Sequence, residues 1–257
     1  AYAKSVMRPL HVEGQFKITS TLTWDGYVRI IGGGRGSDPF FGTVFKKYGN
    51  FVGIRINPGG ELVDYQGFTI DSQAGLGDVS DGMQVSTGGT AGLALRDLQF
   101  IKQGRHGLNI LWAALDQFEN LTATGNGLGV TGDGIHLGPT GTQFVNGNTF
   151  INLDCRSNSG YGLNLAGGGL GTAANQVFGG QADSNTLYGV RSNDLTNVIY
   201  IYCENNVAGN VLLDVNSIRN FVVLTNKSGA VGVVDNGTNN FYLDLSAGIL
   251  RTPSIGG

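Results

Sequence analysis

The sequence predicts an all-β protein, specifically a right-handed, single-stranded parallel β-helix with three sheets and a short N-terminal capping helix. Three observations predict this fold: a repeat of 20–28 residues, a high glycine content, and the lack of amphipathic helical periodicity. Glycine supplies 44 of the 257 residues, more than twice its usual share of roughly 7%. Glycine accepts positive φ, so this composition suits many short strands joined by tight turns.

The repeat is clearest in an element where glycine precedes alternating apolar residues. It reads DGIHL at 133–137 and YGLNL at 161–165. The glycines of successive copies are residues 82, 107, 134, 162, 189 and 209, separated by 25, 27, 28, 27 and 20 residues. This period with several strands indicates a β-solenoid, in which equivalent strands of neighbouring coils stack about 4.8 Å apart.

A second strand follows within each period and also alternates. Its copies include NLDCR at 152–156, GQAD at 180–183 and IYCE at 201–204. An asparagine follows each copy at a matching place, at Asn126, Asn158, Asn185 and Asn206. Because matching residues stack, we expect these side chains to hydrogen-bond along the solenoid as a ladder. A leucine-rich repeat lacks support because its leucine pattern is absent, and a β-sandwich would not need a fixed period.

The chain is expected to form one β-helix domain over residues 1–257. Residues 1–50 would hold the N-terminal cap and first coils, 51–230 the regular coils, and 231–257 the last coil and a tail. A helical turn at Ala1–Met7 would cap the first coil, as solenoid ends require. The glycine-rich stretch at 32–36 has G-x-G spacing but no helix pattern after it, so we interpret it as a turn and not as a dinucleotide site.

Charge and apolar content exclude several functions. The net charge is −3 and no basic run occurs, so nucleic acid is not an expected partner. No run of 18 apolar residues occurs, so membrane insertion is not expected, and residues 1–8 lack the apolar run of a signal peptide. Cys155 and Cys203 should lie two coils apart, roughly 9.6 Å by strand spacing. We therefore expect free thiols.

Several segments carry a resemblance to a known family. GQFKI at 14–18, IIGGG at 30–34 and GFTID at 67–71, together with the YGLNL-type coils, resemble pectate-lyase-like β-helix proteins. Among these, the chain is most similar to bacteriophage tailspike and capsule-depolymerase proteins. The resemblance implies a bacterial polysaccharide as ligand, a homotrimer, and an extracellular or virion location.

Strand alternation predicts a polar patch on the outside of the second strand. Leu153, Cys155, Ala182, Ile201 and Cys203 occupy the apolar phase and should point inward. The residues between them should then form two outward columns, the first of Asp154, Gln181 and Tyr202, and the second of Arg156, Asp183 and Glu204.

This patch offers the residues that glycoside hydrolysis needs, an acid and a base or nucleophile. We expect Glu204 to act as the acid, with Asp183 or Asp154 as the base. Asp183 and Glu204 in adjacent coils would lie roughly 5 Å apart, near the spacing of retaining enzymes. Arg156 would hold a sugar carboxylate or orient Asp183, Tyr202 would stack on a pyranose ring, and Gln181 would bind the glycan. An ordinary solvated surface with an Arg156–Asp183 ion pair is the competing interpretation.

The first strand exposes another polar column that could line a sugar-binding groove. Its members are Gln84, Asn109, His136, Asn164 and Arg191. His136 as a general base, with Arg191 neutralising a carboxylate, would suit elimination from a uronic-acid polymer. His106 resembles the Gly-His-Gly element of polygalacturonases. However, Arg105 replaces the first glycine and the paired aspartate motifs are missing, so that mechanism does not carry over.

No metal or other cofactor is expected, because the histidines at 11, 106 and 136 show no ligand spacing and the acidic calcium-binding nonapeptide is absent. Scattered aspartates could still supply a calcium site. Four functions stay open: a glycoside hydrolase, a polysaccharide lyase, a non-catalytic carbohydrate-binding or adhesin module, and a structural spike segment.

Overall fold

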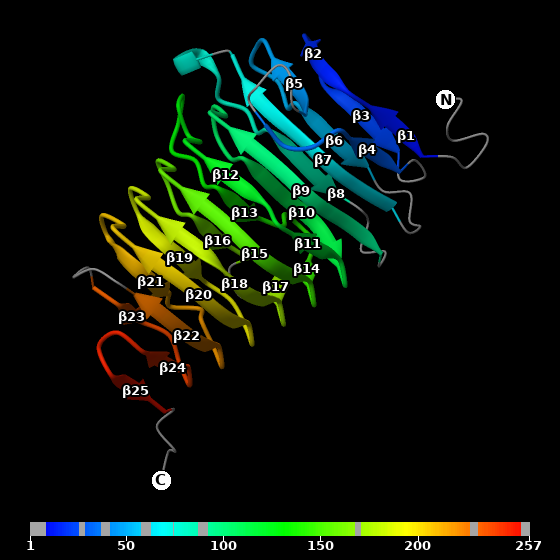
Figure 1. The fold of residues 1–257 in the computed structure, drawn as a ribbon. Helices are drawn as coiled ribbons and strands as arrows, with labels where there is room; N and C mark the ends of the chain where they lie inside the picture. The colour runs from blue at the N-terminus through cyan, green and yellow to red at the C-terminus, as the bar shows by residue number, and fades with distance from the viewer. Residues whose placement is uncertain are drawn as a thin grey trace.

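The fold is a stack of short strands that runs from one terminus to the other (Figure 1). The computed structural model describes residues 9–25, 29–36, 42–57, 63–73, 75–86, 92–167, 171–226 and 231–252. The predicted parallel β-helix is confirmed, because successive strands pair in parallel with their counterparts one coil further on. Within the described residues the only helical element is the 3₁₀ turn η1 at Gly75–Gly77. The predicted capping helix at Ala1–Met7 lies outside them.

The largest sheet, called sheet A here, has 14 strands and follows the whole length of the solenoid. All its strand pairs are parallel except the last, β24 with β25, which is antiparallel. Its strands are β1 (Leu10–Val12), β2 (Gly14–Ile18), β4 (Ile30–Gly32), β5 (Thr43–Lys47), β7 (Val63–Ser72), β9 (Leu93–Ile101), β11 (Gln117–Glu119), β12 (Thr122–Thr124), β15 (Thr149–Arg156), β18 (Gln176–Asp183), β20 (Val198–Glu204), β22 (Phe221–Asn226), β24 (Phe241–Asp244) and β25 (Ile249–Arg251).

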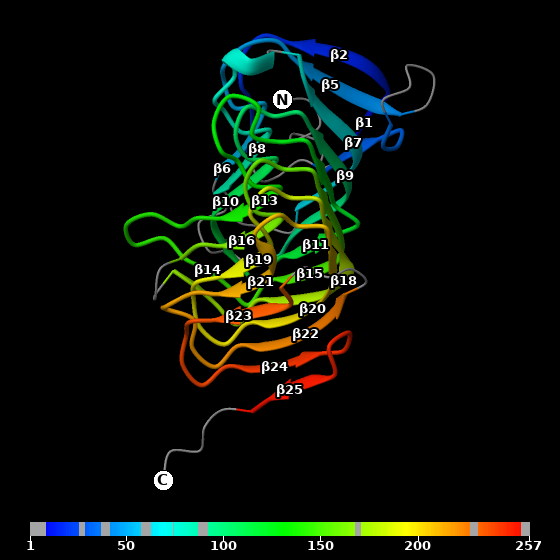
Figure 2. The same ribbon diagram turned by 90° about the vertical axis from the view of Figure 1, so that its left-hand side faces the viewer.

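A second sheet, sheet B, lies across the core from sheet A (Figure 2). Its strands are β3 (Leu22–Asp25), β6 (Ile54–Asn57), β8 (Met83–Ser86), β10 (Leu108–Ala114), β13 (Ile135–Leu137), β16 (Leu163–Leu165), β19 (Tyr188–Ser192), β21 (Gly209–Leu213) and β23 (Val233–Asp235). The end of β10 also pairs with β14 (Val145–Asn146), which pairs with β17 (Thr172–Ala173). Single bridges through Leu195, Ile218 and Thr238 extend this third, narrow ladder.

The core is a single column of apolar side chains between these sheets. Cys155, Ala182 and Cys203 stack in register and are fully buried, so the predicted inward phase is confirmed. Both cysteines are free, as expected from their separation by two coils. Burial raises the pKa of both thiols, which makes them inert packing groups.

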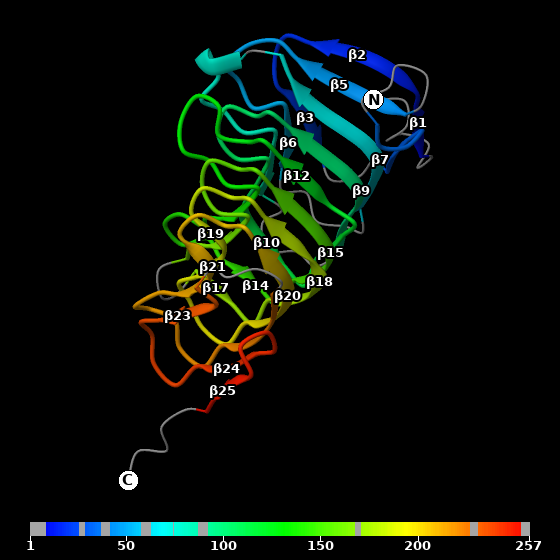
Figure 3. The same ribbon diagram turned by 60° about the vertical axis from the view of Figure 1, so that its left-hand side comes forward.

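Several long strands of sheet A are interrupted by a residue in the left-handed conformation. Asp97, Asn120 and Asn152 have φ of 53°, 52° and 53° at matching points of successive coils. The interruption breaks the alternation, because Phe150 and Leu153 on either side of Asn152 both point into the core. In β18 the same place is taken by Gly179, which has a φ of 72°. Each interrupted strand therefore has two halves with separate outward faces. Figure 3 shows the strands β7, β9, β15 and β18, which carry these interruptions, stacked along sheet A.

Two buried asparagine ladders hold the turns together. In the predicted ladder, Asn126 donates to Asn158, Asn158 to Asn185 and Asn185 to Asn206, each through its backbone N–H and its side-chain amide. A second ladder was not predicted and stands just before the sheet A strands. It runs through Asn148, Asn175, Asn197, Asn220 and Asn240 with the same pattern of bonds.

Replacing one ladder residue should destabilise the fold. Asn185→Ala removes a side chain that accepts two hydrogen bonds from Asn158 and donates to Asn206 and to the Cys155 carbonyl. Because these buried partners lose their bonds, we expect the free energy of unfolding to fall by roughly 3 kcal/mol, measured by urea unfolding. Thr186→Ala, at the exposed neighbouring position, is the control and should change it by less than about 0.5 kcal/mol. Equal stability of both variants would contradict a structural role for the ladder.

Candidate functional site

The six polar residues predicted on the outside of sheet A lie in two adjacent columns. Asp154, Gln181 and Tyr202 are register partners in β15, β18 and β20, and so are Arg156, Asp183 and Glu204. None of the six side chains is buried. The predicted stacking is confirmed, and these six residues are called the carboxylate patch below.

Hydrogen bonds fix the carboxylates of this patch. Asp154 Oδ2 lies 2.7 Å from Arg156 Nη2, and Asp154 Oδ1 accepts a 2.9 Å bond from Gln181 Nε2. Arg156 therefore pairs with Asp154 in its own strand, whereas the competing interpretation expected it to pair with Asp183. Asp183 instead accepts bonds from the Ser184 hydroxyl and from Asn205 Nδ2, at 2.9 and 3.2 Å.

Tyr202 connects the two columns of the patch. Its hydroxyl donates to the Glu204 carboxylate, and this bond, followed by partial desolvation and nearby negative charge, raises the pKa of Tyr202 to about 12. The phenol therefore stays protonated throughout the physiological range. Its aromatic ring borders a hollow that also exposes Asp154 and Gln181.

This hollow has a volume of about 370 Å³ and is bounded on its far side by Arg35. Arg35 lies in the turn after β4, and its Nη1 donates to the Asn120 carbonyl at 2.8 Å and to Thr122 Oγ1 at 3.1 Å. A second hollow of about 420 Å³, with Asp97 in its wall, lies on the other side of Arg35. Arg35 was missed in the sequence because it reaches sheet A at Asn120, 85 residues further along the chain.

The second predicted column, on sheet B, is also in register, but its predicted exposure is wrong for Asn109 and Asn164, which are buried. Gln84, Asn109, His136, Asn164 and Arg191 are successive partners in β8, β10, β13, β16 and β19. Arg191 is held by Asp214, whose Oδ2 lies 3.0 Å from its Nε and 2.7 Å from its Nη2. Its charge is therefore already paired.

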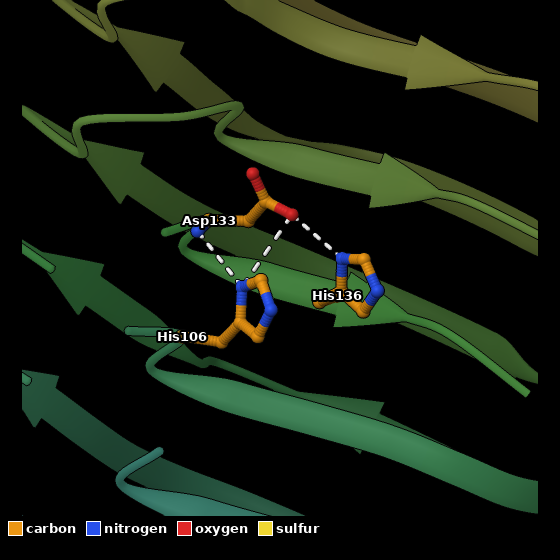
Figure 4. A group of neighbouring side chains, drawn as sticks. All are labelled: His106, Asp133 and His136. Carbon is orange, nitrogen blue, oxygen red and sulfur yellow. Dashed lines mark hydrogen bonds and ion pairs between the residues drawn. The ribbon is translucent and has the colours of Figure 1, made fainter. Parts of the chain in front are cut away.

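Beside this column, His106, Asp133 and His136 form a compact group, called the imidazole cluster below (Figure 4). Asp133 Oδ2 lies 2.6 Å from His136 Nδ1 and 3.5 Å from His106 Nδ1. The two rings stack with centroids 4.2 Å apart. His106 Nδ1 also accepts the backbone N–H of Asp133 at 3.0 Å. His106 and Asp133 each precede the repeat glycine, so adjacent coils bring them together.

No protein-family model matches the chain, and no curated protein matches it. Solved structures do match. ORF18 of Geobacillus virus E2 gives a TM-score of 0.68 at 18% identity, covering 92% of this chain and 53% of that one. The enzymatically active domain of bacteriophage CBA120 tailspike protein 2 gives 0.68 at 13%, covering 96% and 41%. An alginate lyase from Paenibacillus gives 0.57 at 13%, covering 96% and 92%.

This chain has the parallel β-helix fold that the tailspike domain and the alginate lyase have. The predicted resemblance is thereby confirmed, and identities of 13–18% establish the fold alone. The chain spans about half of the first of these structures and less than half of the second.

Burial shapes the protonation of the imidazole cluster in this parallel β-helix. Burial, followed by repulsion from His136, lowers the pKa of His106 to about 4. Burial alone would raise the pKa of Asp133, but hydrogen bonds from His136 and Asn164 and attraction to both imidazoles lower it. The cluster at neutral pH thus combines a neutral His106 with an ionised Asp133.

The sequence analysis found no metal-ligand spacing, yet the tertiary structure gathers two imidazoles and a carboxylate. His106 and Asp133 are 27 residues apart, so a search for local spacing misses them. The repeat length, which places these positions in adjacent coils, was the signal that could have found them. In the part of the chain that the structure describes, no helix is long and apolar enough to span a membrane.

The lowered pKa of His106 predicts a pH dependence of stability. Unfolded His106 takes up a proton near pH 6.5, whereas the folded residue resists protonation until about pH 4. Between these values the unfolded state binds more protons, so the free energy of unfolding falls as the pH falls from about 6.5 to 4. We expect His106 to account for roughly 3 kcal/mol of this loss.

Denaturant unfolding of the wild type and His106→Gln at pH 7, 5.5 and 4 would measure this contribution. The difference in stability between the two proteins should shrink as the pH falls. A constant difference over this range would mean that His106 titrates normally in the folded state.

Proposed function

We propose that this tailspike-like β-helix binds and hydrolyses a bacterial surface polysaccharide at the carboxylate patch, outside the cell or as part of a virion. One observation carries the proposal: the open polar hollow exposes Asp154, Gln181 and Tyr202 directly beside Asp183 and Glu204. The likeness to an enzymatically active tailspike domain and to an alginate lyase supports a carbohydrate substrate.

The hollow has the chemistry for holding a sugar chain. Tyr202 offers a ring face for a pyranose, while Gln181 and Arg35 offer N–H donors for hydroxyl or carboxylate oxygens. Arg35 separates two hollows that lie along the solenoid, so a glycan bound there would cross several coils. This arrangement suits cleavage inside a polymer.

Catalysis by the patch would use Glu204 as the acid. Glu204 gives its proton to the glycosidic oxygen as the bond from that oxygen to the anomeric carbon breaks. Asp154 as the base, two coils away and roughly 10 Å by strand spacing, would activate a water and invert the anomeric centre. Asp183, one coil from Glu204, would instead act as a nucleophile and retain it. Arg156 and Gln181 keep Asp154 oriented in either case.

Elimination by His136 has weaker support in the geometry. The reaction needs a cation for the uronate carboxylate, and Arg191, the candidate for this role, is bound through two nitrogens to Asp214. A purely structural or adhesive role would not require three carboxylates beside one hollow.

Substitutions in the patch should separate these functions. On a panel of capsular and O-antigen polysaccharides, we expect the wild type to release new reducing ends. Glu204→Gln should lower the rate about 100-fold or more, because it removes the acid. Of Asp154→Asn and Asp183→Asn, the one that abolishes turnover identifies the partner of Glu204, either Asp154 as the base or Asp183 as the nucleophile. Glu119→Gln, which alters a carboxylate paired with Arg96 elsewhere on sheet A, is the control and should leave the rate unchanged.

The products themselves provide the decisive outcomes. Unsaturated ends that absorb in the ultraviolet and depend on His136 would overturn hydrolysis in favour of a lyase. Binding of a glycan without products from any variant would overturn catalysis in favour of an adhesin.

We also propose that the chain assembles as a homotrimer through an apolar stripe on the first half of the sheet A strands. Its members are register partners in successive coils: Ile151, Phe178, Tyr200, Val223 and Leu243. Phe178 and Tyr200 are 43% and 45% exposed. A contiguous exposed apolar face of this kind is typical of protein interfaces.

Introducing charge into the stripe should break the assembly. We expect Phe178→Asp with Tyr200→Asp to convert a trimer into monomers in sedimentation-velocity runs, because burying two carboxylates is costly. Gln176→Asp, which places the same charge on β18 outside the stripe, is the control and should leave the trimer intact. A monomeric wild type at all concentrations would contradict the proposed interface.

A further inference from the structure

Asp133 is a buried carboxylate that lacks a permanent cation. Its side chain is 6% exposed, and its charged neighbours among the described residues are His106 and His136. Asp81 occupies the same repeat position two coils earlier and is bound by Arg105 through two 2.7 Å bonds. A buried charge is costly unless it is paired. Asp81 is paired with an arginine, whereas Asp133 is contacted by two histidines, so the Asp133 site is open to a different kind of cation.

The donor atoms around Asp133 converge on one point. Nδ1 of both His106 and His136 faces Asp133 Oδ2 (Figure 4), and the three ligand atoms lie within 4.8 Å of one another. Ligands at 2.0–2.1 Å around a tetrahedral ion would be about 3.3 Å apart. The distances of 2.6 and 3.5 Å to Oδ2 bracket that value, and the two stacked rings must turn about their Cβ–Cγ bonds to aim both Nδ1 lone pairs at one ion.

A neighbouring amide also contacts the imidazole cluster. Asn164 is 4% exposed, and its Nδ2 donates to Asp133 Oδ2 at 2.9 Å and lies 3.3 Å from His136 Nδ1. Its Oδ1 is buried and has no hydrogen-bond partner among the described residues. Asn109 Oδ1 beside Asp81 is unsatisfied in the same way, so this free acceptor is a feature of the repeat that stands open to a water on a bound ion.

The surroundings are built to hold this arrangement. Asp133 Oδ1 accepts the Tyr161 backbone N–H at 2.8 Å, which fixes the carboxylate. A Cβ at Gly160 would lie 2.4 Å from Asp133 Oδ1, and one at Gly138 would lie 2.3 Å from His136 Nε2. A side chain at either glycine would therefore clash with the cluster.

We propose that the imidazole cluster binds one divalent transition-metal ion of the zinc class through His106 Nδ1, Asp133 Oδ2 and His136 Nδ1. His136 moves its proton from Nδ1 to Nε2 to free the ligand lone pair, and His106 exchanges the Asp133 N–H for the metal. Two imidazoles with one carboxylate suit zinc, cobalt or nickel, whereas calcium prefers oxygen ligands alone.

The ion would connect neighbouring coils of the solenoid. His106 stands before β10, Asp133 and His136 belong to the coil of β13, and Asn164 lies in β16. Metal binding would therefore tie adjacent coils of sheet B together from outside the core. This site is separate from the carboxylate patch on sheet A and does not depend on glycan hydrolysis.

The test is calorimetric titration of the chelator-treated, full-length chain with zinc chloride. We expect one zinc ion per chain and a higher melting temperature with zinc. His106→Gln and His136→Gln should each weaken binding by more than about tenfold, since loss of even an outer ligand partner costs roughly 10–100-fold. His11→Gln, which removes the third histidine on β1, is the matched control and should bind like the wild type.

Cobalt titration of the wild type provides a readout that does not depend on how the variants fold. Intense visible bands at one equivalent of cobalt would indicate a low-coordinate site with nitrogen and oxygen ligands. No zinc binding by the wild type, or binding that His11→Gln abolishes, would overturn the proposal. Unchanged zinc affinity in a folded His106→Gln, His136→Gln double variant would also overturn it.

Discussion

The structure depends on coil-to-coil backbone hydrogen bonding in a fixed register. Each strand pairs with the equivalent strand one coil further on, so a residue is stacked on its repeat partner and cannot slip without reversing every side chain. At the turns, where the backbone leaves the sheets, the asparagine ladders hold neighbouring coils in register. Asn185, for example, binds backbone and side-chain groups of the preceding coil and the side-chain oxygen of Asn206 in the next coil. The register is therefore continuous from sheet to turn.

This register turns every position of the repeat into a column of stacked side chains. Inward columns contain apolar groups such as Cys155, Ala182 and Cys203, and outward columns contain the polar residues that could bind or react with a ligand. The left-handed residues within sheet A separate two outward faces on one strand. The apolar stripe follows the first face and the carboxylate patch the second, so the proposed interface and the proposed binding surface can coexist on neighbouring faces.

Stacking also concentrates charge, and the solenoid neutralises buried charge locally. Lys47 and Asp78 are both fully buried and form a 2.5 Å ion pair, and Arg105 binds Asp81 through two hydrogen bonds. The Arg105 bonds help to lower the pKa of Asp81 to about 2, although burial opposes this. Asp133 departs from this pattern, because imidazoles take the place of a lysine or arginine. This departure distinguishes the imidazole cluster from the other buried ion pairs described here.

The sequence by itself determined the fold class, the register and the orientation of the sheet A columns. The repeat glycines, the alternation around Cys155 and the matching asparagines are local signals, and a solenoid converts them into three dimensions by simple stacking. Only the tertiary structure decided that Arg156 binds Asp154, that Arg35 borders the hollow, and that His106 joins Asp133 and His136. These contacts depend on side-chain rotamers and on turns that fold back across coils. Neither is encoded in a residue spacing, so the sequence alone could place the columns but not the partners within them.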